Sequence, residues 1–310
     1  MGEPYVEPQS FNNHRELQRY LPQITRVQFL VPLISKKRIR TQAGNLLIRF
    51  SRRRHYFFGR SWQGTRYVGN VRDTASLSWT RWPHIQGNNL EQLHRLIGNA
   101  ARTCYVDVGA NGGLYCSNIG RLILGRGAVI GLEADPDLAS LAAASAAVNS
   151  LDNVRIFPLA VGDRAGELVF HTVPARSTSS SVLYDHLLKE CGGDTAGIRS
   201  ISVHCIRLDD LLPTLPEIQS ANHIVLKVDV EGHEMSVFRG AAEFIRTRQP
   251  IIFFEWNKDC VTPDRASLKA MTDFLAALAP YRFSAVHEAG GNIPFPPPAE
   301  ESPLNIIAQI

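Results

Sequence analysis

The residues best suited to chemistry follow short apolar stretches that are typical of buried β-strands. The stretch 104–108 leads into a glycine-rich turn with the spacing Asp107-x-Gly109-x-Asn111-x-Gly113. Glycines in such a turn let the backbone bend sharply and approach a ligand more closely than a Cβ would allow. The spacing differs from the Gly-x-Gly-x-x-Gly of dinucleotide-binding turns, which hold a diphosphate at a helix N-terminus. The turn by itself also fits an ordinary strand-to-helix connection.

Two further carboxylates follow the next two predicted strands. Glu133 ends the stretch 128–132, where nucleotide-binding α/β folds place a carboxylate that accepts from both ribose hydroxyls. Asp163 follows the stretch 154–157 and could accept from an adenine amino group. Each acid alone could merely cap a strand end. Together with Asp107, they favour a binding site for a nucleoside.

S-adenosyl-L-methionine (SAM) is a nucleoside ligand without a phosphate, and it carries a sulfonium cation and an amino acid tail. Asp107 would suit the ammonium group of that tail, directly or through water. An NAD-dependent oxidoreductase is disfavoured, because the glycine spacing does not match that of a diphosphate-binding turn.

The densest group of ionisable residues lies at the mouth of another apolar stretch, 224–230. It comprises Lys227, Asp229, Glu231, His233 and Glu234. Burying charges costs several kcal/mol unless they are paired, so a purely structural role requires an internal network such as Lys227 with Asp229 or Glu231. Charges of this kind also gather at functional sites.

The acceptor hydroxyl that the family resemblance described below implies is a weak nucleophile, and a general base would assist its attack on the methyl group. Glu231 is the first candidate for this base, followed by Asp229. His233, with an ordinary pKa near 6.5, is the third, although it is also typical of a surface histidine at a helix start. Glu255, at the end of the stretch 251–254, could complete the pocket wall. Asp229, Glu231 and His233 are also possible metal ligands, but no dedicated ligand spacing stands out and no metal is expected.

From about residue 100 onward, apolar strands alternate with helical stretches. The remaining strands are expected at 168–172, 202–208, 283–287 and 304–310, and helices at 234–245 and 268–278. Asp135-Pro136 has the form of a helix N-cap followed by proline at the first helical position. Repeated βα units of this kind predict an α/β fold with a doubly wound, mostly parallel sheet. Ligands of such sheets bind at the carboxyl ends of the strands.

The N-terminal part lacks this alternation of apolar strands and helices. Short apolar runs separated by turn residues predict short strands there, and 11–24 suggests one short helix. Residues 1–100 hold 16 Lys and Arg against 5 Asp and Glu, whereas the rest hold 17 against 24. We therefore divide the chain into a basic segment, 1–95, and a catalytic domain, 96–310. The basic cluster within 36–60 could attract phosphates, nucleic acid or an anionic membrane surface, or simply be solvated. The segment's aromatic residues favour a small core, with an acceptor-site rim or a homodimer contact as alternatives.

Composition excludes several classes. No stretch approaches the roughly 20 apolar residues of a membrane span, and residues 1–10 do not resemble a secretory signal. The five cysteines are Cys104, Cys116, Cys191, Cys205 and Cys260. Their odd number and scattered spacing predict reduced thiols in a cytoplasmic protein and argue against structural zinc.

These motifs, in this order, resemble the FkbM family of SAM-dependent methyltransferases over roughly residues 100–260. The matching segments are 106–113, 132–136, 160–162, the serines 179–181, 207–209, 227–232, 237–241 and 250–255. One departure is Gly112, where the family often has an apolar residue. The resemblance implies a Rossmann-like, seven-stranded SAM-methyltransferase fold and, usually, O-methylation. The implied acceptors are sugars, glycolipid or polysaccharide headgroups and related natural products.

The resemblance also implies roles by position. It assigns Asp107, Gly109, Asn111 and Gly113 to the methionine part of SAM, Glu133 to the ribose, Asp163 to the adenine, and Asp229 to both cofactor binding and catalysis. Two alternatives remain open. One is a nucleic-acid (RNA) methyltransferase that uses the basic segment, although no Asn-Pro-Pro-Tyr-like or cysteine-nucleophile motif supports it. The other is a non-catalytic SAM-binding partner protein.

Overall fold

The computed structural model describes residues 8–24, 56–71, 73–81, 87–173, 198–258, 266–287, 291–298 and 302–310. Predictions for the arginine-rich stretch 36–54, the serines 179–181, Cys191 and Cys260 lie outside these residues. The described cysteines, Cys104, Cys116 and Cys205, are buried free thiols. No helix in the described part of the chain is long and apolar enough to cross a membrane.

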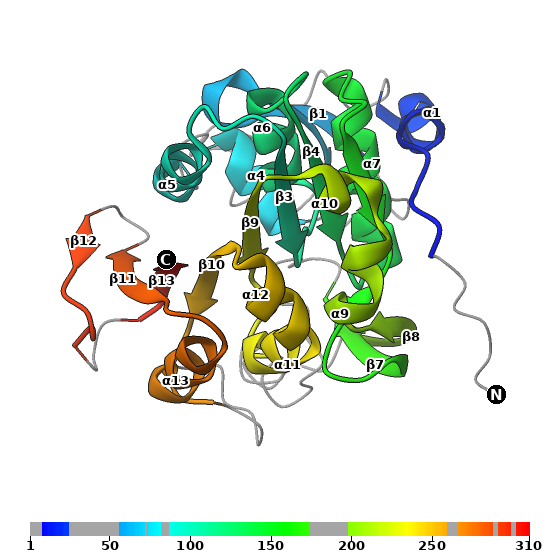
Figure 1. The fold of residues 1–310 in the computed structure, drawn as a ribbon. Coiled ribbons are helices and arrows are strands. Elements are labelled where there is room, and N and C mark those ends of the chain that lie inside the picture. The colour runs from blue at the N-terminus through cyan, green and yellow to red at the C-terminus, as the bar shows by residue number, and fades with distance from the viewer. Residues whose placement is uncertain are drawn as a thin grey trace.

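The centre of the molecule is a sheet with the strand order β12-β11-β13-β10-β9-β3-β4-β5 (Figure 1). Its strands are β3 (Thr103–Val108), β4 (Gly127–Leu132), β5 (Val154–Phe157), β9 (His223–Val228), β10 (Ile251–Trp256), β11 (Arg282–His287), β12 (Asn292–Ile293) and β13 (Leu304–Gln309). The five strands from β5 to β10 are parallel, and β13 runs antiparallel between β10 and β11. The predicted α/β fold with a mostly parallel sheet is confirmed. The two residues of β12 add an eighth strand, too short to leave a hydrophobic pattern.

Helices cover both faces of this sheet, because alternate side chains of each strand are apolar and buried on opposite faces. Tyr105, Val129 and Val225 pack on one side, whereas Val106, Ile130 and Leu226 pack on the other. The first side is covered by α5 (Gly87–Ile97), α6 (Leu114–Leu122) and α7 (Pro136–Val148). The second is covered by α9 (Leu208–Leu211), η5 (Leu212–Thr214), α10 (Pro216–Ser220), α11 (Glu234–Gly240), α12 (Ala242–Arg248) and α13 (Leu268–Leu278).

Local backbone and side-chain features set the start of α7 and the boundary between α11 and α12. The Asp135 side chain accepts from the Asp137 N–H at 2.8 Å, and Pro136 is the first residue of α7, as its sequence predicts. The single helix expected over 234–245 is wrong. Ala241, with φ −118° and ψ 10°, departs from helical geometry and divides this stretch into α11 and α12.

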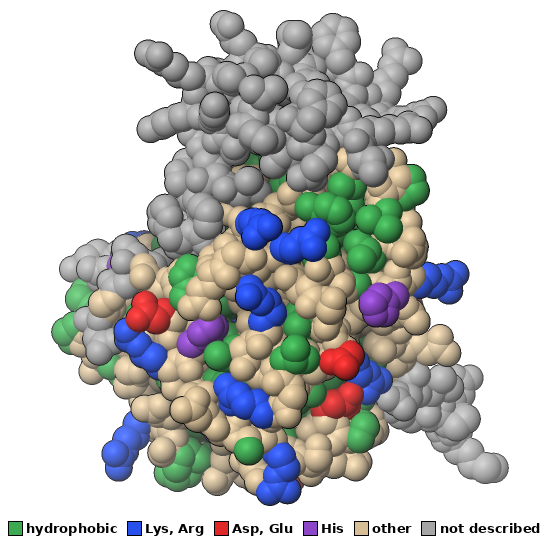
Figure 2. Space-filling model, turned by 90° about the horizontal axis from the view of Figure 1, so that it is seen from above, with side chains coloured by type: hydrophobic (Ala, Val, Ile, Leu, Met, Phe, Trp, Pro, Cys, Tyr) green, Lys and Arg blue, Asp and Glu red, His purple; other side chains and the backbone are tan. Residues whose placement is uncertain are grey.

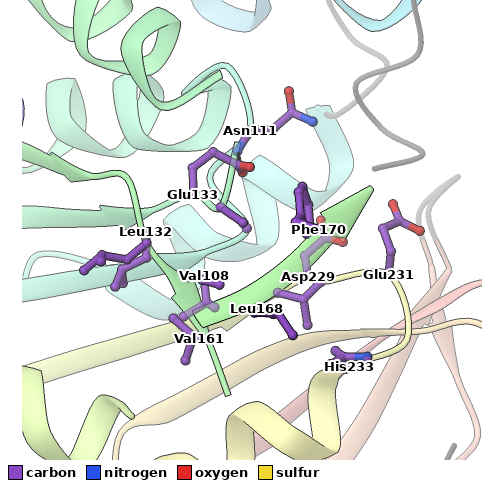
Figure 3. Close-up of a pocket in the computed structure, with 15 residues that line it drawn as sticks. Val108, Asn111, Leu132, Glu133, Val161, Leu168, Phe170, Asp229, Glu231 and His233 are labelled. Carbon is purple, nitrogen blue, oxygen red and sulfur yellow. Dashed lines mark hydrogen bonds between the residues drawn. The ribbon is translucent and has the colours of Figure 1, made fainter. Parts of the chain in front are cut away.

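A smaller sheet is inserted between β5 and β9. It consists of β6 (Ala160–Val161), β8 (Arg199–Ile206) and β7 (Gly166–Thr172), with β8 in the middle. β7 and β8 form an antiparallel pair, and β6 runs parallel to β8. This sheet carries β7 to the carboxyl ends of the main strands, where Leu168 and Phe170 face the functional site (Figure 3).

The described N-terminal elements pack directly on α6 and α7. They are α1 (Asn13–Ile24), β1 (Tyr56–Arg60), η3 (Trp62–Gly64), β2 (Arg66–Asn70) and α4 (Thr74–Arg81). One apolar cluster joins Tyr20, Tyr56 and Val68 to α7, and another joins Tyr67 and Trp79 to the start of α6. These aromatic residues are core residues, as expected. The proposed division between residues 95 and 96 falls inside α5.

Basic side chains in the described part of the chain are spread over the face at the amino ends of the parallel strands (Figure 2). That face is opposite the carboxyl ends, where ligands of parallel sheets bind.

Candidate active site

The candidate site lies where the chain reverses its direction of travel across the sheet. From β3 the chain continues to β4 on one side, and it returns to β9 on the other, so the turns after β3 and β9 are neighbours. Gly109 has a φ of +83°, and a Cβ placed on it would lie 1.9 Å from the Asp229 carbonyl oxygen. Only glycine satisfies both the conformation and the contact, so the two turns can meet.

A cleft opens beside this contact, with about 790 Å³ of empty space including its mouth (Figure 3). Its lining residues are Val108, Gly109, Asn111, Leu132, Glu133, Ala134, Leu159, Ala160, Val161, Leu168, Phe170, Asp229, Val230, Glu231 and His233. The structure therefore brings together Gly109, Asn111, Glu133, Asp229, Glu231 and His233 from the residues singled out in the sequence.

Glu133 is buried at one side of the cleft and points toward Asn111 (Figure 3). Its Oε2 accepts from the Asn111 N–H at 2.7 Å, and its Oε1 accepts from the Asp135 N–H at 2.9 Å. Burial raises the pKa of Glu133 from its ordinary 4.5 to about 7, against the lowering effect of these two bonds. Each oxygen retains a second lone pair that suits a ribose hydroxyl.

Asp107 does not line the cleft, so its expected contact with a ligand, directly or through water, stays a prediction. It is paired in register with Lys227 on β9, and both side chains lie beneath α6, at 0% and 3% exposure. The Lys227 ammonium is 3.3 Å from Asp107 Oδ1 and 3.0 Å from Asp229 Oδ2. It also lies 4.7 Å from the centre of the Tyr115 ring, and Cys116 Sγ donates to Asp107 Oδ2.

This network keeps Lys227 charged. Burial by itself would lower its pKa, but the two carboxylates Asp107 and Asp229 raise it above the ordinary value. The network expected for this segment thus includes Asp229, together with Asp107 from the neighbouring strand. The acid that faces the cleft is Asp229.

On the far side of the cleft from Glu133, the lining acids Asp229 and Glu231 meet Glu255, which was expected to complete the wall but is not among the lining residues. Asp229, Glu231 and Glu255 each offer one oxygen, and these oxygens lie within 4.8 Å of one another. Glu231 has a φ of +52°, a strained conformation of the kind found at functional sites. Oxygens at this spacing also suit a divalent cation, and the expectation of a reaction without a metal stays a prediction.

Glu234 supports this loop from below. Its Oε1 accepts from the N–H groups of Val230 and Gly232, at 3.2 and 3.1 Å. Burial raises its pKa to about 7. Glu234 is therefore a structural acid, whereas His233 lies at the cleft wall and is the N-cap residue that precedes α11.

Two other predicted residues lie outside the cleft. Gly113 precedes α6 and packs against Ala142 of α7. Asp163 lines a second cavity that adjoins the cleft at Val161, Leu168 and His233, so its contact with an adenine stays a prediction.

The apolar wall of the cleft was missed by the sequence analysis. Leu159, Val161, Leu168 and Phe170 come from β7 and from the chain around β6. In the sequence they resemble any strand residues. The one sequence feature that could have placed them at the cleft is that β6 and β7 follow β5, the third parallel strand, directly in the chain.

The sequence matches the family model described as the methyltransferase FkbM domain over residues 107–283. The chain belongs to the FkbM methyltransferase family. No curated protein matches its sequence.

Solved structures with a similar arrangement are distant. The methyltransferase FkbM from Methylobacillus flagellatus KT is 14% identical with a TM-score of 0.43, covering 68% of this chain and 45% of its own. A SAM-dependent methyltransferase from Aquifex aeolicus is 12% identical with a TM-score of 0.37, covering 73% and 90%. A putative O-methyltransferase from Klebsiella pneumoniae is 16% identical with a TM-score of 0.39, covering 73% and 79%. This chain thus spans less than half of the Methylobacillus protein.

The cofactor of this FkbM chain is SAM, and the cleft suits it. Gly109 lines the cleft with bare backbone, and the Leu168 and Phe170 side chains provide an apolar surface for a flat base. Glu133 would hold the ribose hydroxyls. Asp229, held by Lys227, would accept from the ammonium group of the amino acid tail.

Affinity for S-adenosylhomocysteine should rise about tenfold between pH 6 and pH 8, because the Glu133 pKa near 7 makes the ionised acceptor rare at the lower pH. Ribose hydroxyls donate to the ionised form, so proton loss favours binding. Calorimetry over this range should show the slope in the wild type and in Glu243→Gln, an exposed control. Glu133→Gln should bind more weakly with a flat profile; a persistent slope would assign the titration to another group.

Lys227→Met should lower the free energy of unfolding by about 3–5 kcal/mol, since it leaves the buried Asp107 carboxylate without its cation. Adding Asp107→Asn should recover part of the loss. Lys269→Met removes an exposed pair and should change stability by less than about 1 kcal/mol. Urea denaturation measures all of these variants. Equal losses for the two lysines would refute the buried network.

Proposed function

We propose that this chain transfers the methyl group of SAM to a hydroxyl of a sugar, a glycolipid or polysaccharide, or a related natural product. The observation that supports this most is the group of three carboxylates, Asp229, Glu231 and Glu255. They lie beside the glycine-rich turn 109–113, called the cofactor turn below. Carboxylate oxygens accept hydrogen bonds from several hydroxyls of one molecule, and one of them can receive the proton of the reacting hydroxyl.

The surroundings of the three acids suggest different roles. Asp229 Oδ2 already accepts a charged hydrogen bond from Lys227, so its carboxylate is fixed in position and suits orientation. Glu231 follows on the same loop, whose backbone is held by Glu234, and it is the proposed general base. Glu255 reaches the group from the end of β10 and would orient a neighbouring hydroxyl. Asp229 and then His233, which also lines the cleft, stay the alternative candidates for the base.

SAM, when bound, supplies a methyl group on a positively charged sulfur that leaves as a neutral thioether. The protein then has to align the acceptor oxygen, take up one proton and keep water away. The apolar side chains of Leu168 and Phe170 cover the cleft and serve the last purpose.

Glu231→Gln should reduce turnover by about 100-fold or more, the usual contribution of a general base, while S-adenosylhomocysteine affinity stays within about threefold. Release of S-adenosylhomocysteine is measured with a panel of neutral and amino-sugar glycosides and with an RNA oligonucleotide. The exposed Glu91→Gln serves as the control variant. Turnover on RNA that falls steeply with salt, with no glycoside methylated, would favour the nucleic-acid alternative instead. Full glycoside activity in Glu231→Gln would exclude its role as base.

A further inference from the structure

Trp79, on α4 of the N-terminal segment, lies against the middle of the cofactor turn. A Cβ placed on Gly112 would be 3.3 Å from two ring atoms of Trp79, Cζ3 and Cη2, so the indole packs on the glycine backbone. Trp79 is only 6% exposed. Gly112 is not among the positive-φ glycines of the described chain, so its neighbour, rather than its conformation, limits the side chain at this position.

A polar contact reaches the same residue from β2. The Val68 N–H donates to Ser145 Oγ at 3.0 Å, and this hydroxyl lies 3.2 Å from the Gly112 carbonyl oxygen and 2.7 Å from that of Leu141. Ser145 belongs to α7, so this contact links β2, α7 and the cofactor turn. Of the N-terminal segment, α4 therefore contacts Gly112 directly, and β2 reaches it through Ser145.

Both contacts are held by a firmly attached segment. The Tyr67 ring meets Trp79 edge-on at 5.3 Å, and the Tyr67 hydroxyl donates to the Ser76 carbonyl. Thr65 donates to Asn118 of α6 at 2.7 Å and accepts from Arg121 at 2.7 Å. These bonds tie the connection between β1 and β2 to α6, the helix that begins directly after the cofactor turn.

A shift at Gly112 would reach the cofactor contacts within one residue. The Gly112 N–H donates to Asn111 Oδ1 at 2.7 Å, and the Asn111 N–H donates to Glu133 Oε2 at 2.7 Å. We infer that Trp79 is a positioning residue for cofactor binding: its ring holds Gly112 in place and thereby aligns Asn111 and Glu133. This role concerns the cofactor alone and does not depend on the acceptor or on the base.

A double-mutant cycle tests this role by calorimetry with S-adenosylhomocysteine. Trp79→Ala removes the support and should weaken binding about tenfold or more. Gly112→Leu introduces a side chain where the indole lies and should also weaken it. In the combined variant the leucine occupies the vacated space, so affinity should return to within about threefold of the wild type. A double variant no better than the weaker single variant would overturn the proposal.

Trp62→Ala separates positioning from general stability. Trp62 belongs to the same segment but packs against His94 of α5, 4.8 Å between ring centres, rather than against the turn. Both tryptophan variants should lower Tm, whereas only Trp79→Ala should change the Kd. If Trp79→Ala does not fold, Trp79→Phe provides the same comparison. Equal changes in Kd for the Trp79 and Trp62 variants, or none for either, would assign Trp79 to the core alone.

Discussion

The site depends on the contact between the turns that follow β3 and β9. Gly109 approaches the Asp229 backbone too closely for any Cβ, and two residues earlier Asp107 faces Lys227 across the same pair of strands. The buried ammonium then reaches forward to the Asp229 side chain. One strand pair therefore sets the backbone of the cleft and the direction of its most central carboxylate. Burying both partners costs desolvation energy, so the attraction between their charges offsets this cost only when the strands hold them in good geometry.

Two buried acids at and beside the cleft, Glu133 and Glu234, lie in surroundings that disfavour their charge. Burial raises the pKa of Glu133 and of Glu234, although each accepts two backbone N–H bonds. Without a ligand, both groups hold protons more tightly in the folded chain than in the unfolded one. Their ionisation therefore lowers stability as the pH rises between about 4.5 and 7. Hydroxyl donors in the cleft would relieve this penalty at Glu133, whereas Glu234 is satisfied by its own loop. Of these two acids, only Glu133 lines the cleft, so a bound ligand can relieve the penalty at Glu133 alone.

Much of this arrangement was predictable from the sequence, and the exceptions have physical causes. The parallel strands were predictable because they are short apolar runs, and β4 is followed directly by the polar Glu133. The pairing of Asp107 with Lys227 was not, since it depends on the register of two strands 120 positions apart in sequence. Leu168 and Phe170 have the pattern of ordinary strand residues, and only the placement of the small sheet turns them toward the cleft. The role of Trp79 was not predictable from its neighbours in sequence, because it depends on the absence of a side chain at Gly112.

The two sides of the cleft have separate supports. On the cofactor side, the turn and Glu133 are held by Asn111 and by contacts from the N-terminal segment. On the other side, Glu234 holds the backbone of the loop around Glu231, and Lys227 holds Asp229. The strand contact at Gly109 joins them. Glu231 and Glu255 belong to the second side, so they can differ among chains of this fold while the contacts of Glu133 and the turn stay the same. Differences in acceptor are expected there first.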